Sequence, residues 1–194
     1  TKVYQYDLSD SDNLFSFLCE LKTDTKLNSL IYSVGIESTV PLKLVNRKKI
    51  LNSFNVNFFS AFEALRFFSS KKISSDGSSV VLLSSVMSGL GSSGKTIYCS
   101  SKSALNGLIR SSSIELAKRK IRVNAISPSL VNNEMGINLL NKLPANKKFF
   151  YDSKHILGYI NHDDINSMVD FLISVKSSKI TGQNINLDSG YSLQ

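Results

Sequence analysis

The 194-residue sequence is poor in the residues that build disulfide frameworks and metal centres. It contains two cysteines, two histidines and no tryptophan. Cys19 and Cys99 lie far apart in apolar or helical contexts, so we expect reduced thiols and no disulfide. With only His155 and His162 available as imidazole ligands, we expect no metal site.

Long apolar runs are also missing. No stretch approaches the roughly 18 consecutive apolar residues that a membrane-spanning helix needs. Residues 1–7 lack the basic-then-apolar order of a secretory signal. These absences predict a cytoplasmic protein with no membrane partner.

Positive charge, in contrast, is abundant. There are 23 lysines and arginines against 15 acidic residues, which gives a net charge of +8 and a pI near 9.5. The basic residues are scattered along the whole chain and form no single stripe, so we expect a solvated basic surface and no nucleic-acid partner. The same positive field is also compatible with attraction of an anionic cofactor or acyl carrier.

Short apolar runs alternate with longer segments of helical periodicity, which predicts one α/β domain over residues 1–194 with a parallel sheet. The expected strands are 2–6, 29–33, 80–83, 121–126 and 184–187. The expected helices are 10–22, 47–71, 97–118 and 163–175. We expect a turn at Asp76–Gly77 and a mobile, lid-like loop with short helical pieces over residues 129–150.

Three polar side chains are predicted to meet at one edge of this sheet. Tyr98 and Lys102 are four residues apart near the start of a helix, so both project from one face. Ser85 follows the strand 80–83, and open α/β sheets bind ligands at the carboxyl ends of their strands. A Tyr-x-x-x-Lys pair alone is a frequent coincidence, so its surroundings decide its meaning.

Those surroundings resemble the short-chain dehydrogenase/reductase family, and among its members the 3-oxoacyl-carrier-protein reductases. Ser85 stands thirteen positions before Tyr98, and Asn57 matches the family's helix asparagine. Gly35 ends a segment that keeps only the glycine of the family's Asn-Asn-Ala-Gly strand end. The segment 122–129 is similar to Val-Asn-x-x-x-Pro-Gly with Ser129 in place of the glycine, and 180–190 is similar to the C-terminal signature.

The resemblance implies a Rossmann-like doubly wound parallel sheet in three α/β/α layers and an NAD(P)-dependent oxidoreductase that interconverts a ketone and a secondary alcohol. Tyr98 would be the proton donor, with its pKa lowered by the nearby ammonium of Lys102. Ser85 would hold the substrate oxygen, and Asn57 would hold a water behind Lys102. The implied residues for NAD or NADP are Asp7, Leu8, Ser33, Val34, Gly35, Tyr98, Lys102, Pro128, Val131 and Asn133.

One family feature has no counterpart in this sequence, namely the Gly-x-x-x-Gly-x-Gly turn that binds the cofactor pyrophosphate. Gly89, Gly91 and Gly94 precede the catalytic helix and therefore belong to a different loop. We expect the chain to lack the first βαβ elements, and residues 2–6 either to pair out of the usual order or to depend on absent residues. The sequence does not separate NAD from NADP, because the discriminating residue normally ends the missing second strand.

Two functional hypotheses therefore stay open. One is the oxidoreductase, and the other is a non-catalytic relative that acts as a binding or assembly subunit. The resemblance also implies a homodimer or homotetramer formed through the helices 47–71 and 97–118. Apolar side chains in excess of one helix face favour such an interface, namely Phe58, Phe59, Phe62, Phe67 and Phe68.

Overall fold

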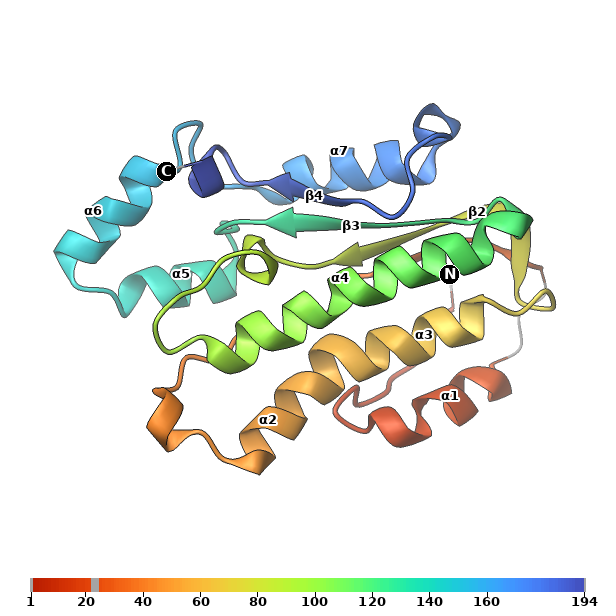
Figure 1. Ribbon diagram of the computed structural model, residues 1–194, viewed down its shortest axis with the longest axis horizontal. Helices are drawn as coiled ribbons and strands as arrows, with labels where there is room; N and C mark the ends of the chain where they lie inside the picture. Colours follow the sequence, from red (N-terminus) through yellow and green to blue (C-terminus); the bar gives the residue numbers. More distant parts are fainter. Residues whose placement is uncertain (1, 22–24, 194) are drawn as a thin grey trace.

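The computed structural model describes residues 2–21 and 25–193 and contains a fully parallel sheet. Its four strands are β1 (Leu27–Tyr32), β2 (Ser74–Leu83), β3 (Arg122–Pro128) and β4 (Asn184–Leu187), in the order β1-β2-β3-β4 (Figure 1). Strands that follow one another in the chain are therefore neighbours in the sheet. The predicted parallel α/β fold is confirmed.

Helices cover both faces of the sheet (Figure 1). One face carries α1 (Ser11–Glu20), α2 (Arg47–Phe54), α3 (Ser60–Phe68) and α4 (Thr96–Leu116), and the other carries α7 (His162–Ile173). Beyond the carboxyl end of β3 lie α5 (Glu134–Asn141) and α6 (Ala145–Lys154), where a looser lid was predicted. None of the helices in the described ranges is both long and apolar enough to cross a membrane.

The centre of the sheet is buried from both sides, which explains the apolar run in β2. Val80 and Leu82 pack with Phe68, Leu105 and other residues of α3 and α4. Val81, which points to the opposite face, packs with Leu172 of α7. Because successive strand residues alternate between faces, a strand covered on both sides must be apolar at every position.

The predicted strand at residues 2–6 is wrong. These residues form no sheet pairing, and the Val3 side chain is 89% exposed. The segment is held instead by side chains next to α1: the Tyr6 ring lies 4.5 Å from the Phe17 ring, and the Tyr6 hydroxyl donates to the Asp10 carbonyl at 2.8 Å. A strand needs a neighbour for its backbone groups, and within the described ranges the outer edge of β1 pairs with nothing.

The predicted helix 47–71 is continuous but irregular. Between α2 and α3 the chain makes a π-helical turn, η2 (Asn55–Phe59), and α3 ends at Phe68. The Tyr32 hydroxyl donates to the Val56 carbonyl in this turn at 2.6 Å. Single π-turns inside α-helices frequently mark functional positions.

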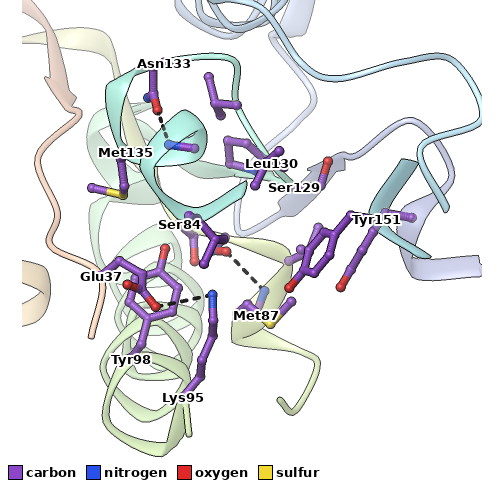
Figure 2. A pocket seen from close by; sticks show the side chains of 17 residues that line it. Glu37, Ser84, Met87, Lys95, Tyr98, Ser129, Leu130, Asn133, Met135 and Tyr151 are labelled. Atoms are coloured by element: carbon purple, nitrogen blue, oxygen red, sulfur yellow. Dashed lines mark hydrogen bonds and ion pairs between the residues drawn. The ribbon is translucent and has the colours of Figure 1, made fainter. Parts of the chain in front are cut away.

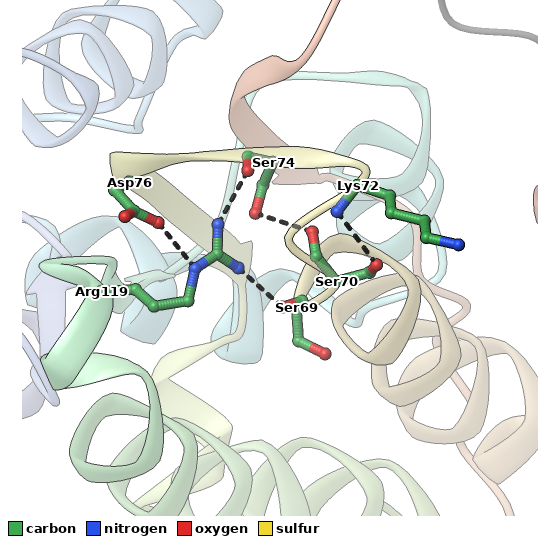
Figure 3. A network of polar contacts seen from close by, with 6 residues as sticks. All are labelled: Ser69, Ser70, Lys72, Ser74, Asp76 and Arg119. Carbon is green, nitrogen blue, oxygen red and sulfur yellow. Dashed lines mark hydrogen bonds and ion pairs between the residues drawn. The ribbon is translucent and has the colours of Figure 1, made fainter.

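The prediction of a turn at Asp76–Gly77 is also wrong, because both residues lie inside β2. The register with β1 jumps between the pairs Leu27–Ser74 and Ser29–Ser79, and Gly77 absorbs the irregularity with a φ of 82°. Arg119, which follows α4, contacts the Asp76 carboxylate at 2.8 Å and the carbonyls of Ser69 and Ser74 at 2.7 Å (Figure 3). One guanidinium thus joins the end of α3, the start of β2 and the end of α4, at the edge of the sheet away from the candidate site.

Candidate active site

A pocket opens at the carboxyl ends of the strands, where the sequence places Ser85 and Tyr98. Figure 2 shows Glu37, Tyr98 and Lys95 on one side of it and Met87 and Tyr151 on another. Its remaining lining residues are Ser84, Ser85, Val86, Pro128, Ser129, Leu130, Val131, Asn133, Met135, Gly136, Leu139 and Tyr191. A mainly apolar wall therefore surrounds a small number of polar groups, which is typical of small-molecule sites.

Ser85 and Tyr98 approach each other inside this pocket. Ser85 lies two residues after the end of β2, and its Oγ accepts a hydrogen bond from the Met87 amide at 3.2 Å, which fixes the side chain at the start of the short helix η3 (Val86–Ser88). Burial raises the pKa of the Tyr98 phenol, the hydrogen bond with Ser85 opposes that rise, and the negative charge of Glu37 adds to it. The phenol is therefore protonated at neutral pH.

Lys102 lies one turn further along α4 and is only 4% exposed. Its Nζ donates to the Leu83 carbonyl at 2.8 Å, and burial lowers its pKa to about 8. The charges that shift the Tyr98 pKa come from Glu37 and Cys99, while burial is the largest cause. The expected lowering of the Tyr98 pKa by Lys102 is therefore wrong for this structure, because burial raises that pKa and Lys102 is not among the groups that shift it.

Asn57 occupies the π-turn and is completely buried. Its Oδ1 accepts from the Ile36 amide at 2.8 Å, and its Nδ2 donates to the Ile36 carbonyl, to Ser101 Oγ and to Ser53 Oγ. The side chain therefore ties the segment after β1 to α2 and α4, directly behind Lys102. The π-turn places it there in the middle of a helix.

Gly35 completes this group. A β-carbon at position 35 would lie 3.0 Å from Lys102 Nζ and 3.3 Å from Asn57 Oδ1. Position 35 therefore has no room for a side chain next to the Lys102 ammonium. This explains why the glycine is the one residue of the predicted strand-end motif that the sequence keeps.

The other residues predicted to bind a cofactor fall into two groups. Pro128, Val131 and Asn133 line the pocket together with Ser85 and Tyr98, and Asn133 also caps α5 by accepting from the Gly136 amide at 2.9 Å. The second group lies outside the pocket lining and comprises Asp7, Leu8, Ser33, Val34, Gly35 and Lys102. The binding roles of both groups stay predictions.

Several pocket residues carry no recognisable sequence signal. Glu37 and Lys95 come from two loops and meet as an ion pair of 3.3 Å. Tyr151 and Tyr191 come from α6 and from the C-terminal segment, and each forms a ring contact with His155. His155 is 4% exposed, contacts the Ser129 hydroxyl at 3.0 Å and contacts the Tyr151 carbonyl at 2.6 Å. It therefore supports the wall of the pocket from behind.

The geometry suits proton transfer to an oxygen atom. A protonated phenol and a hydroxyl share one pocket, and a carbonyl oxygen placed between them would accept two hydrogen bonds. A buried ammonium lies one helical turn away. A group that must protonate an oxyanion has to carry its proton at the working pH, and the raised pKa of Tyr98 meets that condition.

Comparisons with known proteins agree with this geometry. A family model described as enoyl-(acyl carrier protein) reductase matches residues 1–192. The 3-oxoacyl-(acyl-carrier-protein) reductase FabG of Buchnera aphidicola is 29% identical over 95% of this chain and 75% of its own length. The corresponding enzyme of Rickettsia felis is 31% identical over 85% and 67%, and the D-erythrulose reductase of Gallus gallus is 28% identical over 84% and 66%.

Solved structures share the fold. A short-chain dehydrogenase family protein from Francisella tularensis superposes with a TM-score of 0.88 at 23% identity and covers 100% of this chain and 82% of its own. A blue fluorescent protein from a metagenomic library, in complex with NADPH, gives a TM-score of 0.84 at 24% identity over 96% and 74%. The chain spans between 66% and 75% of the length of the three sequence relatives named above.

Proposed function

The chain belongs to the short-chain dehydrogenase/reductase family of oxidoreductases, and from that premise we propose that it interconverts a ketone and a secondary alcohol with NAD or NADP. The observation that carries the proposal is the protonated Tyr98 phenol beside the Ser85 hydroxyl in a pocket at the carboxyl ends of parallel strands. The named relatives are reductases of carbonyl compounds.

In the proposed reaction, each residue has a physically defined task. The Ser85 hydroxyl donates to the ketone oxygen and holds it near the Tyr98 phenol. Tyr98 gives its proton to that oxygen as negative charge develops there, and the raised pKa keeps the proton available at neutral pH. The ammonium of Lys102, one turn further along α4, would balance the charge of the phenolate that remains. Asn57 is a positioning residue that fixes the loop in front of Lys102.

The residues present fit the nicotinamide end of a dinucleotide. The Lys102 ammonium, next to which Gly35 carries no side chain, would hold a ribose hydroxyl, and Pro128, Val131 and Asn133 line the pocket together with Tyr98. When bound, the cofactor supplies or accepts the hydride. The described ranges contain no glycine-rich turn between a strand and a helix for the pyrophosphate.

We propose that residues upstream of Thr1 supply this turn in the complete gene product. The unpaired outer edge of β1 supports this, because an edge strand next to an apolar groove is a site where a further parallel strand adds. The groove is lined by Tyr4, Leu18, Leu27, Leu30 and Phe67, among others. Residues 1–194 would then be the larger part of one Rossmann-like domain.

A non-catalytic binding or assembly subunit is the second candidate. It is favoured by the missing turn and by Ser129, which occupies a position where the family has glycine and which is held by His155. Titration of the complete gene product with NADH and with NADPH separates the two candidates. Micromolar binding of either dinucleotide supports the oxidoreductase, and absence of binding to both supports the alternative.

Association into a homodimer or homotetramer is part of the proposal. A groove between α3 and α4 is lined by Phe58, Phe62, Gly107 and Leu108, and the residues Phe59 and Phe62 are 41% and 43% exposed. Phe67 and Phe68, which were expected to contribute to this surface, are buried in the core. A sedimentation mass equal to one chain would contradict the oligomer.

The two free cysteines are consistent with the proposed cytoplasmic location.

A further inference from the structure

An ion pair in the wall of the active-site pocket has no task in the reaction described above. Lys95 Nζ lies 3.3 Å from the Glu37 carboxylate, and both residues line the pocket beside Tyr98 (Figure 2). Lys95 is only 7% exposed. Burying a lysine is unfavourable unless its charge is compensated, so the pair is a built feature of the pocket.

The backbone holds the two charges together. Glu37 belongs to the segment after β1, and Lys95 precedes α4; the Val40 amide donates to the Gly94 carbonyl at 2.7 Å and joins the two segments. A β-carbon on Gly94 would lie 3.3 Å from the Thr39 methyl group, so the segments are in close contact. The Thr39 hydroxyl also donates to the Glu37 carboxylate. The position of Lys95 is therefore fixed before any substrate arrives.

The ammonium faces the place where a ketone would react. Lys95 Nζ is 5.9 Å from the centre of the Tyr98 ring, and an ammonium has three N–H donors. Around it the pocket is lined mainly by apolar side chains such as Met87, Leu130 and Leu139. A substrate with only one oxygen would occupy Ser85 and Tyr98 and would leave Lys95 without a contact to the substrate.

We propose that Lys95, held by Glu37, is a specificity-determining residue that binds a second oxygen atom of the substrate. The preferred substrates are ketones with a neutral carbonyl or hydroxyl oxygen a few bonds from the reacting carbonyl. Neutral oxygens are favoured over a carboxylate, because Glu37 already balances the charge of Lys95 and would repel a second anion. This inference rests on the proposed oxidoreductase function.

The test uses the complete gene product and a matched pair of substrates, a 3-oxo ester and a simple ketone of the same chain length. Lys95→Met is expected to lower kcat/KM for the ester by about 10- to 100-fold, the range for one hydrogen bond to a charged group, and to change kcat/KM for the simple ketone little. Lys118→Met removes one exposed positive charge after α4 and is the control. An equal decrease of kcat/KM for both substrates would show that Lys95 only stabilises the pocket wall, and it would overturn the inference.

Two further variants keep the test decisive if Lys95→Met does not fold. Lys95→Gln retains an N–H donor and is expected to keep part of the preference for the ester. Glu37→Gln leaves the ammonium unbalanced and is expected to raise kcat/KM for the 3-oxo carboxylate relative to the ester. A residue that only stabilises the pocket wall would not change selectivity in this direction, so an unchanged ratio in both variants contradicts the inference.

Calorimetric titration with the 3-oxo ester separates this inference from the proposed function. Binding that depends on Lys95 without any turnover would refute the oxidoreductase and retain the recognition role. Turnover of both substrates with no dependence on Lys95 would retain the oxidoreductase and refute the recognition role. Absence of both turnover and binding would refute both.

Discussion

Replacement of Lys102 by methionine measures the free-energy cost of burying the Lys102 ammonium one helical turn from Tyr98. The side chain is 4% exposed, and burial lowers its pKa from the ordinary 10.5 to about 8. At about 1.4 kcal/mol for each pH unit, this difference corresponds to about 3 kcal/mol. The hydrogen bond from Nζ to the Leu83 carbonyl, at 2.8 Å, offsets about 1.5–3 kcal/mol of this cost.

We therefore expect Lys102→Met to raise the free energy of unfolding by about 1 kcal/mol at pH 7, because methionine fills a similar volume without a charge. The gain depends on pH in a defined direction. Since the folded-state pKa is lower than the unfolded one, the burial penalty is complete below pH 8, shrinks between about 8 and 10.5, and is absent above that range. The advantage of the variant must therefore fall as the pH rises.

The assay is urea or thermal unfolding of both proteins at pH 7 and near pH 10. For a chain of this size, 1 kcal/mol corresponds to a shift in Tm of about 2–4 °C. Lys118→Met is the matched control, because Lys118 is exposed, and it should leave the stability unchanged at both pH values. A Lys102→Met variant that is less stable than the parent at pH 7, or a difference that does not change with pH, would refute the reasoning.

Three further predictions concern the other site residues. Tyr98→Phe should lower kcat by about 10²- to 10⁴-fold while dinucleotide affinity, measured by titration, changes little, and retained turnover would contradict the proton-donor role. Asn57→Ala should lower the free energy of unfolding by about 2–4 kcal/mol, because it removes the Asn57 partner of the partly buried Ile36 amide and carbonyl; a neutral effect in urea unfolding would contradict this. Because burial raises the pKa of Tyr98, the initial rate of ketone reduction should stay level through neutral pH. The rate of alcohol oxidation, which needs the Tyr98 phenolate, should rise with pH. An oxidation rate that stays level between pH 7 and 9 would contradict the role of Tyr98 in proton transfer.

Apolar periodicity predicted those elements that bury a face against the sheet. The strand at 184–187 has the predicted bounds, and α4 and α7 each differ from the prediction by one or two residues at the ends. Such elements owe their stability to side-chain burial, which the sequence pattern records directly. Residues 2–6 have a similar pattern but lack a neighbouring strand, and pairing between distant segments is not encoded locally.

The apolar periodicity of the sequence did not predict the irregularities of the backbone. The π-turn at 55–59 keeps a helical pattern on both sides, and Asp76–Gly77 has the composition of a turn but lies in a bulge of β2. In the bulge, contacts from Arg119 fix the chain where the local sequence favours a turn. Side chains that are distant in sequence thus decide the local conformation.

Within the site, the strand-end rule predicted where Ser85 lies, and Ser85 lines one pocket together with Tyr98. The direction of Lys102 was not predictable, because it depends on the position of the Leu83 carbonyl. Glu37 and Lys95 are separated in sequence by the helical stretch α2–α3 and by β2, and the Val40–Gly94 hydrogen bond joins the two segments that carry them. Partners brought together by loops leave no periodic signal in a single sequence.

The proposed function requires transfer of a hydride from the dihydronicotinamide to the ketone carbon, and an isotope experiment detects this transfer. The complete gene product is incubated with a 3-oxo ester and with dihydronicotinamide cofactor that carries deuterium at the transferable position, and the product is analysed by mass spectrometry. We expect a secondary alcohol with deuterium on the former carbonyl carbon, and far less of this product in the same time with Tyr98→Phe. Alcohol without deuterium, or equal labelled product from Tyr98→Phe, would contradict the proposed function.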